Sequence, residues 1–91
     1  MQAVFSNVGQ KPFIDLTWAP NVEGDLAGYN VFRWVKGVEP KKLNQQLIQT
    51  PSYRDENIEP GQAYFYAVSA VDLRGNESPR STTANETVPN K

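Results

Sequence analysis

Alternation of apolar and polar side chains is the feature that most limits how this chain can fold. In segment 63–72, AYFYAVSAVD, one set of alternate residues is Tyr64, Tyr66, Val68 and Ala70. In segment 12–20, PFIDLTWAP, the same spacing relates Ile14, Leu16 and Trp18. This period of two is typical of a strand with one buried face. No window of about 11 or more residues keeps the i, i+3, i+4, i+7 spacing of an amphipathic helix, so the sequence predicts strands and almost no helix.

Turn residues divide the chain into short strands. Proline, glycine, acidic and amide residues gather at Pro20 with segment 21–25, and again at 37–40, 50–51 and 60–61. Between them the pattern predicts seven strands, at 2–8, within 12–20, and at 27–35, 42–46, 52–55, 63–72 and 81–88. This spacing favours an all-β, antiparallel two-sheet sandwich, with a barrel as the alternative. We expect residues 1–91 to form one domain, with its core between 3 and 88 and a tail at 89–91.

The charge balance and composition exclude whole classes of function. Nine basic and ten acidic residues give a net charge of −1, and Lys41-Lys42 is the only basic cluster. Nucleic-acid binding needs a basic stripe that neutralises phosphates, so we expect no nucleic-acid partner. No apolar run approaches the roughly 20 residues that cross a bilayer, so we expect no membrane insertion. The chain has no cysteine and no histidine, which removes thiolate chemistry and the commonest metal ligands.

Carboxylates are the remaining candidates for chemistry. Those available are Asp15, Glu23, Asp25, Asp55, Glu56 and Asp72. Outward strand positions and loops of a small convex sandwich offer no cleft that excludes water, so we expect solvated surface charges, no catalytic residue and no enzyme activity. The acidic segments 23–25 and 54–57 lack the spacing of a calcium loop and are typical of turns. We therefore expect no metal site and no cofactor.

Five segments, in this order and with these gaps, carry a resemblance to a known family. They are IDLTW at 14–18, LAGYNVFR at 26–33, KKLN at 41–44, PSYRDENIEPGQAYFYAVSAVD at 51–72 and RGNESPRS at 74–81. Together they resemble a fibronectin type III domain of the kind found in bacterial proteins. The run IEPGQAY at 58–64 is the most specific part. The resemblance implies an immunoglobulin-like sandwich of seven strands.

The resemblance also implies structural roles for individual residues. Trp18 would pack centrally between the sheets, and Tyr64 would form the tyrosine corner, with its hydroxyl bonded to backbone at the preceding turn. Alternation adds Tyr29 and Tyr66 to the expected core. Arg33 falls on the inward side of its strand, so we expect it at the sheet edge with its head in water. The proline-rich entry that the family has before its first strand is missing, which leaves the register of that strand open.

The loop VDLRGNESPRS at 71–81 contains Arg74-Gly75-Asn76, which differs by one residue from the Arg-Gly-Asp tripeptide of some adhesion modules. Asn76 is neutral and cannot supply the carboxylate that such receptors read through a bound cation. Gly75 and Asn76 tolerate positive φ, and Asp72 and Ser78 can bind backbone groups at the ends of the loop. We interpret this loop as a turn between two strands.

Alternation predicts one candidate binding surface. If Tyr29 faces the core on one strand and Tyr66 on another, alternation turns three aromatic side chains outward: Phe32, Trp34 and Phe65. The resemblance makes these two strands neighbours in one sheet. Such a cluster is either a contact patch for an adjacent domain, a partner or a glycan, or a set of rings that pack on one another and on long polar neighbours such as Arg33 or Lys36.

The resemblance implies a non-catalytic module of a larger, exported bacterial protein, located in the extracellular space, the periplasm or at the cell surface. We expect a monomeric spacer or protein-interaction domain whose partners are neighbouring domains of its polypeptide or another protein. The alternative is a carbohydrate-binding accessory module of a secreted enzyme, which would stack exposed aromatic side chains on a polysaccharide. Fold alone does not choose between these functions.

Overall fold

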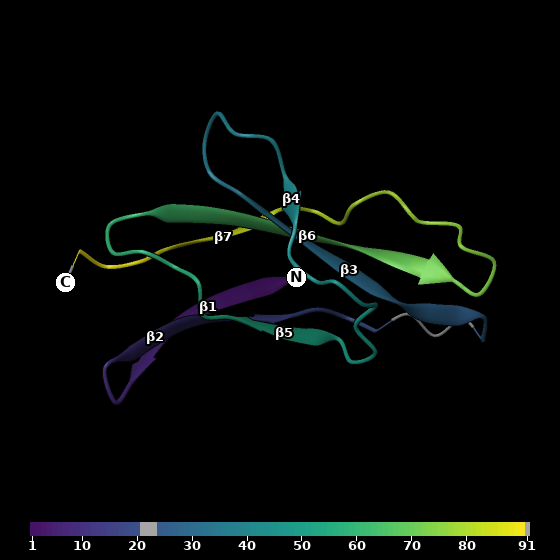
Figure 1. Ribbon diagram of the computed structural model, residues 1–91, viewed down its shortest axis with the longest axis horizontal. Helices are drawn as coiled ribbons and strands as arrows, with labels where there is room; N and C mark the ends of the chain where they lie inside the picture. The colour runs from purple at the N-terminus through teal and green to yellow at the C-terminus, as the bar shows by residue number, and fades with distance from the viewer. Residues whose placement is uncertain (21–23, 91) are drawn as a thin grey trace.

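The computed structural model describes residues 1–20 and 24–90, in which seven strands form two antiparallel sheets (Figure 1). One sheet has the order β1-β2-β5, from β1 (Gln2–Val8), β2 (Lys11–Thr17) and β5 (Ser52–Asp55). The other has the order β4-β3-β6-β7, from β4 (Lys41–Lys42), β3 (Leu26–Trp34), β6 (Ala63–Asp72) and β7 (Ala84–Thr87). The described residues contain no helix, and hence none that could span a membrane. The predicted all-β, two-sheet sandwich is confirmed.

The core lies between the two sheets and is filled by the residues that alternation turns inward. Ile14 and Leu16 of β2, and Val31 and Tyr66 of the facing sheet, are each 0% exposed. Full burial of one such side chain contributes about 1.5–3 kcal/mol, so this inner layer supplies much of the stability. A slip of one residue along a strand would turn its inward set to solvent, so burial also fixes the register.

The structure fixes the register of β1, which the sequence leaves open. Phe5 lies opposite Ile14, and Val4 lies opposite Asp15, in an antiparallel ladder. Phe5 packs against the core, whereas Val4 is 43% exposed. β1 therefore follows the alternation of β2, and it also lies beside β7 of the other sheet.

The prediction of a strand at 42–46 is wrong, because β4 ends at Lys42 and an asparagine side chain continues the pairing. Asn44 Oδ1 accepts a hydrogen bond from Val31 N at 2.8 Å, and Asn44 Nδ2 donates to Tyr29 O at 3.4 Å. The same Nδ2 donates to Asn30 Oδ1 at 2.9 Å. This buried side chain takes the place of backbone from a neighbouring strand. The Val31 N–H and the Tyr29 carbonyl at the edge of β3 therefore have hydrogen-bond partners without a regular ladder.

β7 is shorter than the predicted strand at 81–88 because a serine pairs with β6 before β7 begins. Ser81 N donates to Val68 O at 2.7 Å, and Ser81 Oγ accepts a hydrogen bond from Val68 N at 3.0 Å. The Ser81 hydroxyl takes the place of a backbone carbonyl as the acceptor for Val68 N, so the regular ladder does not include this residue. Beyond β7, Val88 N donates to Gln62 O at 2.9 Å, so the chain stays attached to the sandwich after the strand ends.

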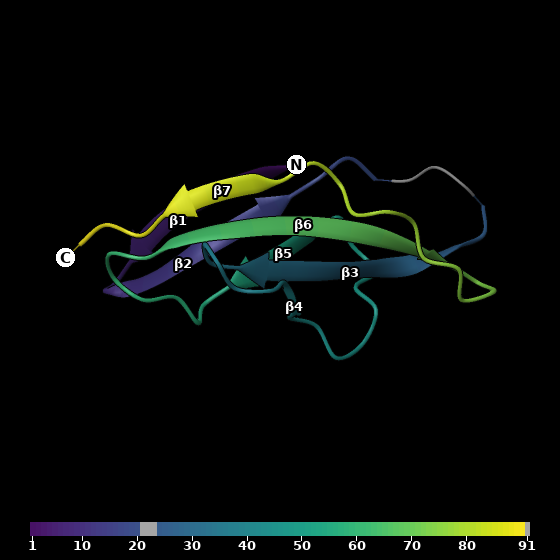
Figure 2. The ribbon, with the colours of Figure 1, turned by 90° about the horizontal axis from the view of Figure 1, so that it is seen from above.

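Different segments of the chain lie at the two ends of the sandwich. The C-terminal residues, the β1–β2 turn and the start of β6 lie at one end, and the β6–β7 loop lies at the other (Figures 1 and 2). We call the first the C-terminal end, made of segments 9–12, 59–62 and 88–90. Of the predicted turn at 20–25, residues 21–23 lie outside the described residues, as does Lys91 of the predicted tail.

Candidate functional site

The outer surface of the β4-β3-β6-β7 sheet carries the three aromatic residues that alternation turns outward. Trp34 lies opposite Phe65 in the ladder between β3 and β6. Their rings are stacked, with centroids 6.1 Å apart and planes inclined by 17°. Phe32 lies two residues back along β3, opposite Ala67. We call Phe32, Trp34 and Phe65 the aromatic face, and all three residues are half-buried.

Basic side chains border the aromatic face near Phe32. The Arg80 guanidinium lies 5.1 Å from the centroid of the Phe32 ring, within the range of a cation–π interaction. Lys42 lies opposite Phe32 in β4 and is exposed. Arg80 therefore covers Phe32, whereas Arg33, one of the neighbours expected from the sequence, points to the other face of the sheet.

A polar cluster occupies another part of the same sheet surface. Glu77 accepts hydrogen bonds from Ser69 Oγ and from Asn30 Nδ2, the second at 3.2 Å. These bonds lower the pKa of Glu77 below its ordinary value, with the Ser69 bond contributing most. Because both donors engage its carboxylate, Glu77 ties the β6–β7 loop to the sheet.

The prediction for Arg33 is wrong, since its head does not lie in water at a sheet edge. Arg33 Nη1 donates to Asp55 Oδ2 at 2.8 Å and to Asn57 O at 2.9 Å, and the Arg33 side chain is 21% exposed. Arg33 belongs to β3 and Asp55 to β5, so this ion pair joins the two sheets. The guanidinium also lies 5.1 Å from the centroid of the Tyr64 ring. Alternation gives the face on which Arg33 lies but not the carboxylate that faces it.

The prediction that Asp55 is a solvated surface charge is wrong as well, because Asp55 is 3% exposed. Besides Arg33, the Tyr66 hydroxyl donates to Asp55 Oδ2, at 2.7 Å. Asp55 Oδ1 accepts a hydrogen bond from Asn57 N at 3.1 Å, which agrees with the predicted turn-forming role. With these donors, the buried carboxylate meets the requirement that a buried charge be paired and hydrogen-bonded.

The Arg33–Asp55–Tyr66 cluster shifts the pKa values of two groups. Burial, together with the hydrogen bond to Asp55 and its negative charge, raises the pKa of Tyr66 well above its ordinary value. Burial alone would lower the pKa of Arg33, but the hydrogen bond to Asp55 and its charge outweigh burial and raise it. Tyr66 thus stays neutral and Arg33 stays charged around neutral pH. Structural ion pairs shift pKa values in this way, so the cluster belongs to the architecture of the sandwich.

The four residues expected to be structural lie in the buried cluster between the sheets: Trp18, Tyr29, Tyr64 and Tyr66. Trp18 packs edge-on against Tyr29, with ring centroids 5.4 Å apart. The Tyr64 hydroxyl accepts a hydrogen bond from Glu59 N at 3.0 Å, which is a tyrosine-corner contact to backbone upstream. These side chains lie in the core, on the opposite side of the sheet from the aromatic face, and do not form part of it.

The Arg74-Gly75-Asn76 loop is a tight turn held by Asp72. Asp72 Oδ1 accepts hydrogen bonds from the backbone N of Arg74 at 2.9 Å and of Asn76 at 2.8 Å. Gly75 has a φ of 88°, which glycine adopts without strain. Ser78 Oγ accepts a hydrogen bond from the backbone of β6 at 2.9 Å. The predicted turn, with Asp72 and Ser78 binding the backbone at its ends, is confirmed.

Acidic residues do not gather into a metal site in the part of the chain that the structure describes. Residues 1–20 and 24–90 hold no group of three or more Asp, Glu, His or Cys side chains that could bind a metal ion. Asp15 instead forms an ion pair with Arg54 at 2.8 Å across the β2–β5 ladder. Glu23, one of the carboxylates considered from the sequence, lies outside the described residues.

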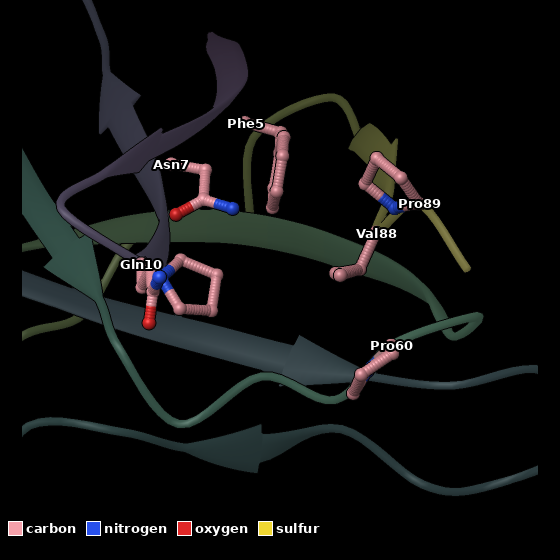
Figure 3. A pocket seen from close by; sticks show the side chains of 7 residues that line it. Phe5, Asn7, Gln10, Pro60, Val88 and Pro89 are labelled. Carbon is pink, nitrogen blue, oxygen red and sulfur yellow. The ribbon is translucent and has the colours of Figure 1, made fainter. Parts of the chain in front are cut away.

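Two surface features of the structure could not be predicted from the sequence alone. The Arg54 guanidinium lies 3.9 Å from the centroid of the Phe13 ring, and Phe13 is 8% exposed although it alternates with the inward Ile14. The sequence does contain one signal for this contact, the opposite charges of Asp15 and Arg54. That signal can be used only when β2 and β5 are known to be neighbouring strands. The second feature is a groove of about 580 Å³ at the C-terminal end, lined by Phe5, Asn7, Gln10, Pro12, Pro60, Val88 and Pro89 (Figure 3).

Comparison with known proteins places this sandwich in a class. No protein-family model matches the sequence. The amylopullulanase of Thermoanaerobacterium thermosulfurigenes is 38% identical over 73 residues, which are 78% of this chain and 4% of that enzyme. The crystal structure of a β-1,2-glucanase from Parabacteroides distasonis matches with a TM-score of 0.78 and 27% identity, over 98% of this chain and 12% of that one. An Fn3-like protein from Clostridium thermocellum matches with a TM-score of 0.72 and 27% identity, over 96% of this chain and 88% of that one.

The class that fold and sequence define is therefore the fibronectin type III-like β-sandwich domain. This chain is such a domain, and it is similar both to an Fn3-like protein of nearly its own size and to small parts of two larger bacterial enzymes. It spans only 4% of the amylopullulanase and 12% of the glucanase.

Proposed function

We propose that this chain is a non-catalytic module of a larger, exported bacterial polypeptide that acts on carbohydrate, in which it serves as a spacer or protein-interaction domain. One observation carries the proposal: the sandwich corresponds to 4% of an amylopullulanase and 12% of a β-1,2-glucanase. A segment this small contributes to such an enzyme through its shape, its stability and its surface.

The engaged state of two carboxylates supports the non-catalytic role. Asp55 is bound by Arg33 and Tyr66, and Asp15 is paired with Arg54. Glycoside hydrolysis needs two carboxyl groups on opposite sides of the scissile bond, one of them free to give a proton. Both carboxylates are already engaged by an arginine, and Asp55 is only 3% exposed, so neither is free to contact a glycosidic bond.

The test compares three proteins: the complete gene product, the same product without this module, and the isolated chain of 91 residues. We expect the isolated chain to release no sugar from starch, pullulan or β-1,2-glucan, and the shortened product to keep its turnover number on soluble oligosaccharides. Hydrolysis by the isolated chain would contradict the proposal, as would a complete gene product with no activity on any glycan.

Within this role we propose that the aromatic face contacts a protein partner. Half-buried aromatic rings with a basic border suit a partner surface that offers apolar side chains and carboxylates, because aromatic residues supply most of the energy of such contacts. The stacked Trp34 and Phe65 rings present this surface on two paired strands, which keeps it rigid. Trp34→Ala should weaken partner binding at least tenfold, whereas Leu73→Ala, at a 72% exposed site in the β6–β7 loop, should not. Equal affinity of both variants would assign the rings to the sheet alone.

Glycan binding is the second candidate function of the same face. It is favoured by the similarity of this chain to parts of an amylopullulanase and a β-1,2-glucanase, and by the stacked ring pair, since aromatic rings stack on sugars. Affinity electrophoresis of the isolated chain in gels containing amylose, pullulan or β-1,2-glucan separates the two candidates. Retardation that Trp34→Ala abolishes and Leu73→Ala preserves would establish glycan binding, and unretarded migration in all three gels would leave the protein contact.

A further inference from the structure

Two basic side chains at one end of the aromatic face have no carboxylate partner. The Arg80 guanidinium lies 5.1 Å from the centroid of the Phe32 ring, and Lys42 is paired with Phe32 in the β3–β4 ladder. Within the part of the chain that the structure describes, neither of them forms an ion pair, whereas Arg33 and Arg54 both do. Arg80 and Lys42 are exposed, so their charges are available to an anionic group of a partner.

The carboxylate of Glu77, which lies near these two cations, is held by other groups. Glu77 accepts hydrogen bonds from Ser69 Oγ and Asn30 Nδ2. The bond from Ser69 contributes most to the lowered pKa of Glu77, and the positive charges of Lys42 and Arg80 lower it further. Two cations beside one carboxylate leave this part of the surface positive, although the chain as a whole has a net charge of −1.

An apolar surface adjoins this positive region. Trp34 lies two residues beyond Phe32 on β3, a step of about 7 Å along a strand, and it stacks on Phe65. Side chains two residues apart in an extended segment point to the same side with the same spacing. One extended segment of a partner can therefore place a carboxylate beside Arg80 and an apolar side chain against Trp34.

We infer that Phe32, Arg80 and Lys42 form a carboxylate-binding subsite, through which the aromatic face selects an acidic segment of a protein partner that also carries apolar side chains. The inference rests on the protein-interaction role proposed above, and it makes Arg80 and Lys42 the residues that determine specificity. An arginine that lies over a ring keeps N–H groups that can bind both oxygens of a carboxylate. The Phe32 ring excludes water from one side of the guanidinium, which strengthens its attraction to a negative charge.

The two charges favour such a segment over a neutral polysaccharide. Amylose, pullulan and β-1,2-glucan carry no charge, so they gain nothing from the positive charges of Arg80 and Lys42. A neutral sugar that stacked on Phe32 would also have to displace the Arg80 guanidinium from the ring. An acidic segment binds the guanidinium where it lies and keeps the cation–π contact.

Binding of synthetic polymers tests the inference. The probes are a random copolymer of glutamate and tyrosine, a random copolymer of lysine and tyrosine, and polygalacturonate, which is an acidic polysaccharide. Each polymer is immobilised, and the chain is passed over it in a surface plasmon resonance experiment. We expect the chain to bind the glutamate–tyrosine copolymer at least tenfold more tightly than either of the other polymers. Salt raised from about 0.05 M to about 0.5 M should weaken this binding at least fivefold, because salt screens exposed charges.

Charge variants locate the binding on the surface. The double variant Arg80→Gln with Lys42→Gln should bind the glutamate–tyrosine copolymer at least tenfold more weakly. The matched control, Arg74→Gln with Lys11→Gln, also removes two exposed positive charges, one in the β6–β7 loop and one on β2, and should bind as the original chain does. Arg80→Lys keeps the charge and should retain most of the affinity that Arg80→Gln loses.

Unchanged affinity of the double variant of Arg80 and Lys42, with binding abolished by Trp34→Ala, would overturn the inference and leave the protein contact of the aromatic face standing. Equal losses in both double variants would assign the binding to net charge and overturn the inference as well. Tighter binding of polygalacturonate would assign the subsite to an acidic glycan, and no binding of the glutamate–tyrosine copolymer would remove the subsite altogether.

Binding that neither Trp34→Ala nor the charge variants reduce would overturn both the inference and the proposed protein contact of the aromatic face. Arg80 and Lys42 are exposed, so their substitution should leave the sandwich folded. If a variant nevertheless does not fold, the preference of the unmodified chain among the three polymers and its dependence on salt decide the inference.

Discussion

The inner and outer faces of the β4-β3-β6-β7 sheet arise from the same two long strands but are stabilised in different ways. On the inner face, Val31 and Tyr66 are 0% exposed, and Arg33 reaches across the core to Asp55 on the other sheet. On the outer face, Trp34 stacks on Phe65 within one sheet. Alternation alone sends adjacent residues to these two environments.

This difference separates residues that hold the fold from residues that are free to act. Contacts of the inner face couple the two sheets, so the loss of one partner leaves a cavity or an unpaired charge inside the protein. Contacts of the outer face join neighbours on one surface, and water can replace either partner. The aromatic face can therefore serve binding without being required for folding, and variants of the two faces should behave differently.

The largest effect is expected at the ion pair that joins the sheets. Asp55→Asn removes the charge that compensates Arg33 and weakens the acceptor of the Tyr66 hydroxyl. Breaking a buried pair on one side costs about 3–5 kcal/mol, and partial exposure of Arg33 puts the expected loss near the lower limit, about 3 kcal/mol. Urea denaturation followed by tryptophan fluorescence measures it. A loss below about 1 kcal/mol would show that water compensates Arg33 and that the pair behaves as a surface pair.

Tyr66→Phe should have the next largest effect, because it removes one hydrogen bond to the Asp55 carboxylate and keeps the ring. Hydrogen bonds to charged groups contribute about 1.5–3 kcal/mol, so we expect a loss of about 2 kcal/mol. Retention of full stability in the same urea experiment would mean that Arg33 and Asn57 satisfy Asp55 without Tyr66.

Tyr66→Phe should also change how the stability of the protein depends on pH. The raised pKa of Tyr66 means that the folded protein holds this proton more tightly than the unfolded chain does. This contribution is fully present below about pH 10, the pKa of an unperturbed tyrosine, and is lost as pH rises further. Urea midpoints of the original protein should fall above about pH 10, and those of Tyr66→Phe should fall less, with Tyr53, whose pKa burial also raises, accounting for the remainder. An identical alkaline decline in both proteins would contradict the assignment.

Neutral pH is the control window for that experiment. The chain contains no histidine, and the shifted groups move away from neutrality: the pKa of Glu77 is lowered and that of Tyr66 is raised. Stability should therefore be nearly flat between about pH 6 and 8. A reversible change of the urea midpoint across this window would reveal a titrating group that the cited shifts do not include.

The strands and the inward residues could be predicted from the sequence because alternation is a local property. Segment 63–72 was predicted with the bounds that β6 has, and Tyr66 with its inward position. The strand at 42–46 could not be predicted correctly, because Asn44 pairs with β3 through its side chain and leaves no alternation to detect. Pairing through a single side chain produces no alternation of apolar and polar residues in the sequence, so it cannot be recognised from the pattern.

The partners of individual side chains depend on how the two sheets stack, which alternation does not encode. Arg33 was placed on the correct face but in the wrong environment, because Asp55 lies on the other sheet. The outward direction of Trp34 and Phe65 follows from alternation, whereas their stacking requires the ladder register between β3 and β6. The groove at the C-terminal end combines four separate segments, so no local pattern marks it.

On the outer face, Trp34→Ala should cost about 1 kcal/mol, since a stacked aromatic pair contributes about 0.5–1.5 kcal/mol beyond its area and the ring is half-buried. Thermal unfolding compares it with Phe65→Ala and with the double variant. The double variant should lose less than the sum of the single losses, because the two rings share one contact. A loss of several kcal/mol for Trp34→Ala alone would mean that the ring is part of the core and would remove the basis for a separate binding face.

The smallest effect is expected at the ion pair on the outer surface of the other sheet. Asp15 and Arg54 approach to 2.8 Å, the same distance as Arg33 and Asp55, but their side chains are 41% and 53% exposed. Water and salt screen such a pair, and Arg54 keeps its contact with the Phe13 ring when the carboxylate is lost. Asp15→Asn should therefore shift the urea midpoint by an amount close to experimental error, and added salt should reduce the shift further. If Asp15→Asn instead destabilised the protein as much as Asp55→Asn, burial would not be what distinguishes the two pairs, and the contrast between inner and outer contacts would have to rest on distance and hydrogen-bond geometry alone.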